Sequence, residues 1–289
     1  MLNICLLSVN GFSYRRILSH MNERKTNTCR VQSLGRADAI LEALAAVDDW
    51  ARLTDISRET GLKKTTAFNL LDTLVNLGFA ERDTAAGRYR LGLRNLELGR
   101  LVQGRLKIVQ MNEPLLIRLC ANTRETVNLA VPYLYEVLIT HSLEGKQGVR
   151  VTSYAGTRAS FHSTACGKAM LAHMPDRFFN ELLRRSPLLP VTPHTIINVK
   201  KLSAELEKIR EVGFAAEHQE NEIGAACVAS VIHDGFGSVA GAISVAGPVG
   251  RMTPEAIARI GKLLMRETAA ASRRLGGLEL DEVLTRSPA

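Results

Sequence analysis

The stretch LTDISRETGLKKTTAFNLLDTLVNLG, residues 53–78, decides the fold of the N-terminal part of the chain. Its first half predicts a short helix that is capped by Thr54 and ends at Thr60, with Gly61 in the following turn. Its second half predicts a helix over about 63–77 that Gly78 ends. One face of that helix is apolar and carries Ala67, Leu70, Leu71, Leu74 and Leu77. Two short helices joined by a glycine turn indicate a helix-turn-helix.

An earlier helix and a later hairpin complete this module. With Ser33 as its predicted N-cap, the earlier helix has apolar residues at three- and four-residue steps, namely Ile40, Leu41, Leu44 and Val47. Strand-like runs at 79–83 and 88–91 flank a turn at 84–87, which predicts a hairpin directly after the second helix of the pair. The sequence therefore predicts a winged helix-turn-helix over residues 31–93.

The outward face of the second helix carries candidate DNA contacts. Its N-terminal turns are basic and polar, with no acid before Asp72, and such turns meet base edges in the major groove. Lysine suits guanine or phosphate, asparagine suits adenine, and hairpin arginines suit the phosphate backbone or the minor groove. The alternative is a solvated face on a small helical domain. The candidates are Lys63, Lys64, Thr65, Thr66, Phe68, Asn69, Arg82, Arg88 and Arg90.

Composition and charge narrow the class of protein without naming it. The chain has 289 residues, of which 46% are hydrophobic and 23% charged, as in ordinary globular proteins. Half of the net charge of +8 lies in residues 1–30 and only +1 in residues 31–106, so bulk charge is weak evidence for nucleic-acid binding. No apolar run is long enough for a membrane span. Five widely spaced cysteines indicate neither a disulfide framework nor a zinc site, which favours the reducing cytoplasm.

The two ends of the chain are predicted to be tails, over residues 1–30 and 278–289. The apolar run that starts at Leu2 precedes Arg15 and Arg16, which is the wrong order for a secretory signal. Our hypothesis is that Met21 is the true start, or that the first tail is a loosely ordered arm.

The remainder of the chain predicts a linker helix and a second domain. Residues 94–106 are amphipathic, and this helix would join the two domains and could pack against its twin in a dimer. Its apolar side carries Leu93, Leu96, Leu98 and Leu101. Residues 107–277 mix helices and strands without strict alternation, which favours an α+β domain with an antiparallel sheet. Its predicted helices are 112–122, 167–173, 175–184, 200–212 and 254–275, and its predicted strands are 126–132, 135–142, 225–233 and 238–246.

The segment STACGK, residues 163–168, is a candidate anion site. Serine or threonine caps followed by small residues open a helix whose free N–H groups can hold a carboxylate. The alternative is a capped helix that binds no ligand.

Several segments resemble the IclR family of bacterial transcription regulators. They include SLGRADAILEALA, GRYRLGLRNLELG, FHSTACGKAMLAHMP and GFAAEHQENEIGAACVASVIHDGFGSVAGAISVAGP, and together they cover about residues 33–277. The resemblance implies a winged helix for DNA, a linker helix and a GAF-like α/β effector-binding domain. It also implies dimers, or dimers of dimers, and two winged helices in a dimer would bind a pseudo-palindromic operator. Asn69 stands where the family usually has arginine, so the operator sequence does not carry over.

The resemblance also implies the effector contacts. The helix-opening contacts fall on Ala165 and Cys166. The acidic position, where aspartate is more usual, falls on Glu217. The other contacts fall on Ala225, Cys227, Ser244 and Ala246, the last of which replaces a second serine. One hydroxyl fewer predicts a larger or less polar acid than glyoxylate, such as an aromatic one, and no stabilisation by glyoxylate or pyruvate.

Three other interpretations of the sequence compete with a regulator. A thiol-based redox enzyme could use Cys166, Cys227, His162 and Glu217, but no nucleophile motif is present. A metal site has no HxxxH or HExxH pair among the seven histidines. An architectural DNA-binding protein would not need the long second domain. We therefore predict a non-enzymatic, cytoplasmic regulator of metabolic (catabolic) genes that binds double-stranded DNA and a small carboxylate, without cofactor or metal.

Overall fold

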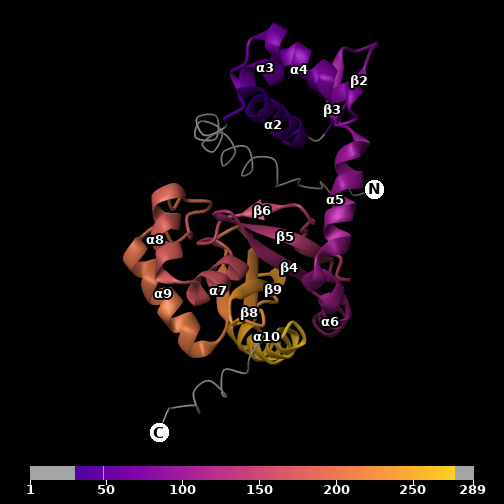
Figure 1. Cartoon of the computed structure of the whole chain (residues 1–289). Helices are drawn as coiled ribbons and strands as arrows, with labels where there is room; N and C mark the ends of the chain where they lie inside the picture. The colour runs from indigo at the N-terminus through magenta and orange to yellow at the C-terminus, as the bar shows by residue number, and fades with distance from the viewer. Residues whose placement is uncertain (1–29, 48, 277–289) are drawn as a thin grey trace, which may run out of the picture. The chain divides into compact units, whose positions relative to one another are not determined.

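The computed structural model describes residues 30–47 and 49–276, which form two compact units divided between Val102 and Gln103 (Figure 1). Apart from Arg30, the predicted N-terminal tail with Met21 lies outside the described residues, as does the tail predicted over 278–289. In the described part of the chain, no helix is both long and apolar enough to cross a bilayer.

The first unit is a winged helix-turn-helix, as predicted. Its helices are α2 (Gln32–Ala45), α3 (Leu53–Thr60) and α4 (Lys64–Asn76). Its antiparallel sheet has the order β1-β3-β2, with β1 (Ala51–Arg52), β2 (Ala80–Asp83) and β3 (Arg88–Leu91). A common core packs the three helices against the sheet and contains Ile40, Leu44, Ile56, Leu71, Leu74 and Tyr89. We call β2, the turn at 84–87 and β3 the wing.

Details of the helix ends differ from the predictions. Val31 is the N-cap of α2 and Arg52 that of α3, so the expected caps Ser33 and Thr54 lie inside their helices. Leu77 is the C-cap of α4 and is 59% exposed, so it is not part of the buried face on which the sequence placed it. The two glycines behave as expected. Gly61 and Gly78 have φ of 67° and 78°, a left-handed conformation that glycine adopts without strain.

Two helices follow the wing. The helix α5 (Leu93–Arg105) spans the division between the units and has no buried residue, so its leucines are exposed in the single chain. The next helix, α6 (Lys107–Thr123), begins five residues before the predicted start at 112. The early start is explained by packing, because Ile108 and Val109 of its first turn are buried in the core of the second unit.

The second unit contains a six-stranded sheet in which every pair is antiparallel, as predicted. The strand order is β6-β5-β4-β9-β8-β7. The strands are β4 (Thr126–Tyr133), β5 (Glu136–Leu143), β6 (Arg158–Ala159), β7 (Ala215–His218), β8 (Ala225–His233) and β9 (Val239–Pro248). The sequence did not reveal β6 and β7, which have two and four residues and are recognised only by their pairing.

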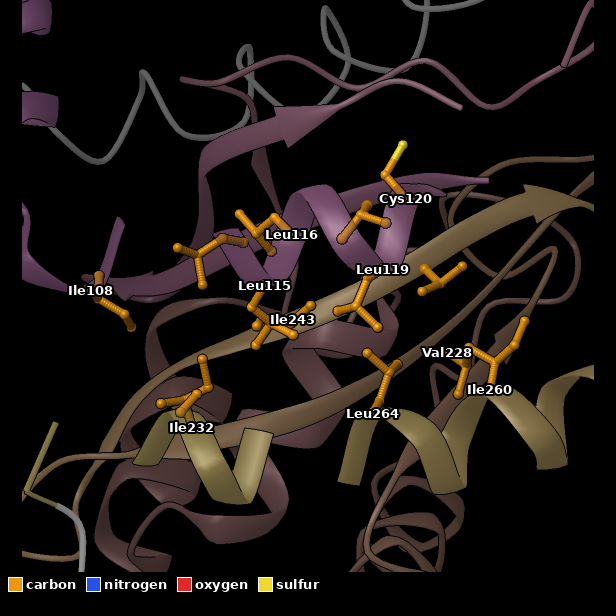
Figure 2. Packing of buried hydrophobic residues seen from close by; sticks show 14 of the residues in the cluster. Ile108, Leu115, Leu116, Leu119, Cys120, Val228, Ile232, Ile243, Ile260 and Leu264 are labelled. Carbon is orange, nitrogen blue, oxygen red and sulfur yellow. The ribbon is translucent and has the colours of Figure 1, made fainter. Parts of the chain in front are cut away.

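Helices cover both faces of this sheet (Figure 1). One face packs against α6 and α10 (Pro254–Arg274), and Figure 2 shows Leu115, Leu119 and Leu264 gathered around Ile243 of β9. The opposite face packs against α7 (Ala165–His173), α8 (Asp176–Arg185) and α9 (Val199–Val212). Because side chains alternate along a strand, neighbouring residues of β8 serve different cores. Val228 lies in the first core and Ala229 in the second.

Candidate DNA interface and effector site

The predicted DNA-reading residues lie together at the N-terminal end of α4. Lys63 is the N-cap and Lys64 the first helical residue. Of the six helical candidates, only Thr66 is half-buried, while the others are exposed. The buried side of the same helix, with Ala67, Leu71 and Leu74, holds it against the core. The opposite side is therefore available to a duplex, and we call these six residues the DNA face.

The wing arginines are engaged by groups within their own unit. Arg90 pairs with Glu81 at 2.7 Å, and its guanidinium carbon lies 4.6 Å from the ring centre of Trp50. Arg88 approaches Asp83 at 3.5 Å. These two acids offset much of the positive charge that the sequence placed on the wing. Arg82 forms no ion pair with an acid in the described part of the chain, and its guanidinium group lies over the rings of Phe68 and Tyr89 instead.

The turn of the wing is held by one carboxylate. Asp83 accepts the N–H groups of Ala85 and Ala86 at 3.0 Å each, and Gly87 follows with a φ of 63°. The Ala86 hydrogen bond is the main cause that lowers the pKa of Asp83. This side chain therefore shapes the hairpin as well as facing Arg88.

The sheet of the second unit places the predicted effector residues in adjacent rows. Glu217 of β7 is paired with Cys227 of β8, which is paired with Ala246 of β9. Two residues along β9, Ser244 lies in the next row of the same face, and Ala225 lies two residues before Cys227 on β8. The strands thus bring five of the seven predicted residues together.

The N-terminus of α7 supplies the other two residues. Thr164 is its N-cap and accepts the N–H of Gly167 at 3.1 Å, and Ala165 and Cys166 form the first turn. Both are buried, and Cys166 packs in the same core as Ala242 of β9. Gly167 has no room for a side chain, since an added Cβ would lie 2.3 Å from the carbonyl oxygen of Phe161. We call Ala165, Cys166 and the five predicted strand residues the effector site.

Six of the seven residues of the effector site are buried, and Cys227 is half-buried. Hollows of about 430 and 140 Å³ lie elsewhere, the first beside Trp50 and Arg82 and the second among α7, α8 and α9. None of the seven residues lines either hollow.

The two thiols of the effector site are not poised for nucleophilic chemistry. Burial raises the pKa of Cys166 to about 11 and raises that of Cys227 well above its usual value, despite hydrogen bonds with Ser244. The side chain of His162 is directed to the carbonyl of Leu189, at 3.0 Å from Nε2. Because a reactive cysteine needs a thiolate, this arrangement argues against the redox-enzyme interpretation.

A buried ion pair adjoins the site and was not predicted. Lys168 of α7 is fully buried, with Nζ 2.6 Å from Oε1 of Glu220 and 4.0 Å from Oε1 of Glu205. The other oxygen of Glu220 is buried with no hydrogen-bond partner in the described part of the chain. The available signal was a lysine in a helix that is otherwise apolar on every side, from Ala165 to Ala172.

Unlike Glu220, Glu217 forms no ion pair with a cationic side chain among the residues that the structure describes. It is 4% exposed, and its Oε2 accepts the N–H of Glu220 at 2.9 Å. Burial is the main cause that raises the pKa of Glu217 to about 7, and the charge of Glu220 adds to it.

Two family models match the chain. The model of the IclR helix-turn-helix domain matches residues 33–84, and that of the bacterial transcriptional regulator IclR C-terminal domain matches residues 101–273.

Known transcriptional regulators have similar sequences, and solved structures of IclR proteins have similar folds. HTH-type transcriptional repressor AllR of Klebsiella pneumoniae is 32% identical over 238 residues, covering 82% of this chain and 87% of that protein. HTH-type transcriptional regulator XynR of Escherichia coli (strain K12) is 32% identical over 246 residues, covering 85% and 98%. The Thermotoga maritima IclR structure has 31% identity and a TM-score of 0.67, covering 84% and 98%. An IclR homolog from Microbacterium hydrocarbonoxydans, complexed with 4-hydroxybenzoate, has 26% identity and a TM-score of 0.68, covering 84% and 99%.

Proposed function

The chain belongs to the IclR family of bacterial transcriptional regulators, and from this premise we propose that it controls a catabolic gene set in response to a small carboxylic acid. DNA binding by the winged helix-turn-helix follows from the family itself. The relatives found are transcriptional regulators, and the proposed role involves no reaction catalysed by the chain. The proposed layout is a DNA-binding domain at 31–93, a linker at 94–106 and an effector domain at 107–277.

The DNA face supports a division of labour on the operator. Lys63 and Lys64 contact phosphates and supply affinity that falls with salt. Base discrimination comes from Thr65, Thr66, Phe68 and Asn69. The wing contributes through Arg82, because Arg88 and Arg90 already face acids.

We propose that the active form is a homodimer on a pseudo-palindromic operator, with half-sites about one helical turn apart. The exposed leucines of α5 support it, since Leu93, Leu96 and Leu101 are all more than half exposed in the single chain. Two such dimers would form the tetramer. Effector binding would favour one of two states that differ in the spacing of the two DNA faces. The free energy of this shift cannot exceed the difference between the effector's binding free energies in the two states.

One observation carries the effector proposal. The N-terminus of α7 and the polar side chains of Glu217, Cys227 and Ser244 converge on one covered face of the sheet. Helix N–H groups and a hydroxyl suit a carboxylate, and alanines suit an apolar remainder. The relative complexed with 4-hydroxybenzoate supports an aromatic acid. At Ala246 a methyl group stands where a hydroxyl would bind a smaller, more polar acid.

Two measurements on the full chain test this function. Footprinting on the DNA upstream of the chain's own gene should show a protected, pseudo-palindromic site at low ionic strength. A thermal-shift screen should show stabilisation by one or more aromatic acids and none by glyoxylate or pyruvate. Failure to bind any fragment of that DNA would refute the operator proposal. Clear stabilisation by millimolar glyoxylate would refute the aromatic assignment.

A further inference from the structure

We propose that Glu217 binds the effector while holding a proton, so that each carboxylate effector is taken up together with one proton. The neutral carboxyl group would donate a hydrogen bond to the carboxylate of the effector. This inference rests on the proposed function of the same site and names the chemistry by which that site selects its ligand.

The charges around Glu217 leave no partner for a further anion. Lys168 of α7 is a buried cation, and it faces two carboxylates, Glu220 at 2.6 Å and Glu205 of α9 at 4.0 Å. The charge of Lys168 lowers the pKa of Glu217, but burial raises it by more. In residues 30–47 and 49–276, no cationic side chain forms an ion pair with Glu217. A buried carboxylate without a cation is costly, so Glu217 reduces that cost by keeping its proton.

The other groups that face Glu217 do not reverse this balance. The β8 neighbour Cys227 and the α7 residue Cys166 are neutral thiols, since burial raises the pKa of each. From the turn after β7, Glu220 and Asn221 donate their N–H groups to Glu217, which favours the ionised form, whereas the carboxylate of Glu220 opposes it. His162, before α7, has a pKa lowered by burial and is therefore neutral at pH 7.

An effector carboxylate at the N-terminus of α7 would meet this acid across the site. Two ionised carboxylates in one buried site repel each other, whereas a carboxyl group and a carboxylate share a proton. The binding-competent chain is then the one in which Glu217 is neutral. Burial raises the pKa of Glu217 to about 7, so the competent fraction falls through the neutral range as pH rises.

The test is calorimetric titration of the full chain with the tightest-binding acid of a panel that begins with 4-hydroxybenzoate. From a competent fraction governed by a pKa of about 7, we expect binding about tenfold weaker at pH 8 than at pH 6. Titrations in buffers of different ionisation enthalpy should show proton uptake that approaches one per ligand above pH 8. In Glu217→Gln, the amide still donates, so binding should persist without pH dependence or proton uptake.

Glu222→Gln is the matched control, because Glu222 lies on the same turn, is half-buried and also has a pKa raised by burial. This variant should retain the proton uptake of the original chain. Binding to the original chain that is independent of pH and takes up no proton would overturn the inference. Undiminished proton uptake in Glu217→Gln would overturn it as well. If no acid of the panel binds at any pH, the carboxylate effector itself is refuted. That outcome is distinct from acid binding that takes up no proton.

Discussion

Arg82 of the wing contacts Phe68 of α4, with the guanidinium carbon 5.7 Å from the centre of the phenyl ring. The same guanidinium carbon lies 5.7 Å from the ring centre of Tyr89, a buried residue of β3. Arg82 therefore links Phe68 of the DNA face to Tyr89 of the wing. A residue expected to touch DNA also holds the two DNA-binding elements in one arrangement.

We predict that Phe68→Leu lowers the free energy of unfolding of the N-terminal unit by roughly 0.5–1 kcal/mol, the usual size of an exposed cation–π contact. The change keeps an apolar side chain but removes the ring that Arg82 faces. Denaturant unfolding of the full chain measures it. In the background of Arg82→Met the same substitution should cost less, and equal costs in both backgrounds would show that the contact contributes nothing.

Asn69→Ala should relax base preference at one operator position while leaving binding intact elsewhere. Asparagine pairs with adenine through two hydrogen bonds, and losing such a pair removes about 1–3 kcal/mol of discrimination. Footprinting on operator variants measures the change. Asp72→Asn, further along the same exposed side of α4, is the control and should preserve the preference. Unchanged preference in Asn69→Ala would mean that another face of α4 reads the bases.

Lys64→Ala should weaken binding to all DNA sequences alike. If Lys64 neutralises one phosphate, the slope of log affinity against log salt becomes shallower by about one unit. Gel-shift titrations between low and moderate salt give that slope. Lys107→Ala removes an exposed lysine outside the DNA face and should leave the slope unchanged. An equal slope in Lys64→Ala would place this lysine away from the phosphates.

The sequence predicted the elements with strong periodicity and missed those made by pairing. The helix-turn-helix, the wing and β8 were all found, because apolar spacing and glycine turns are local signals. In contrast, β7 has the short sequence AAEH and becomes a strand only beside β8. Since Glu217 lies on that strand, its position in the effector site could be carried over only by the family resemblance.

Charge pairing was equally hidden from the sequence. The sequence predicts that the wing arginines face the phosphate backbone or the minor groove, yet Glu81 and Asp83 face two of them across the hairpin register. Lys168 and Glu220 are 52 residues apart, and nothing local relates them. Long-range contacts of this kind depend on the completed sheet and its covering helices.

Breaking the Lys168–Glu220 pair should strongly destabilise the second unit. Lys168→Met leaves the Glu220 carboxylate buried beside Glu205 without a cation, and removing one partner of a buried pair costs about 3–5 kcal/mol. Glu220→Gln in the same background should recover part of the loss by removing that charge. Urea unfolding measures both. Equal stability of Lys168→Met with and without Glu220→Gln would contradict the ion-pair explanation.

The pH dependence of folding offers a test of Glu217 that needs no ligand. Its pKa is raised from 4.5 to about 7 in the folded chain, so between these values the folded state binds more protons than the unfolded state. The free energy of unfolding therefore falls as pH rises from about 4.5 through 7. The titration of Glu217 lowers the free energy of unfolding by about 3 kcal/mol if the whole pKa shift is realised, which is an upper value.

Glu217→Gln removes the titrating group, so the variant should lose this part of the slope. From pH 5 to pH 8, its free energy of unfolding should therefore fall less than that of the original chain. Urea unfolding at half-unit intervals from pH 5 to 8 measures the difference between the two curves, which cancels the contributions of all other groups that both chains share. Glu222→Gln provides the reference for a half-buried carboxylate on the same turn. Parallel curves for Glu217→Gln and the original chain would mean that Glu217 is ionised in the folded state throughout this range, and the proton-coupled binding proposed for it would lose its physical basis.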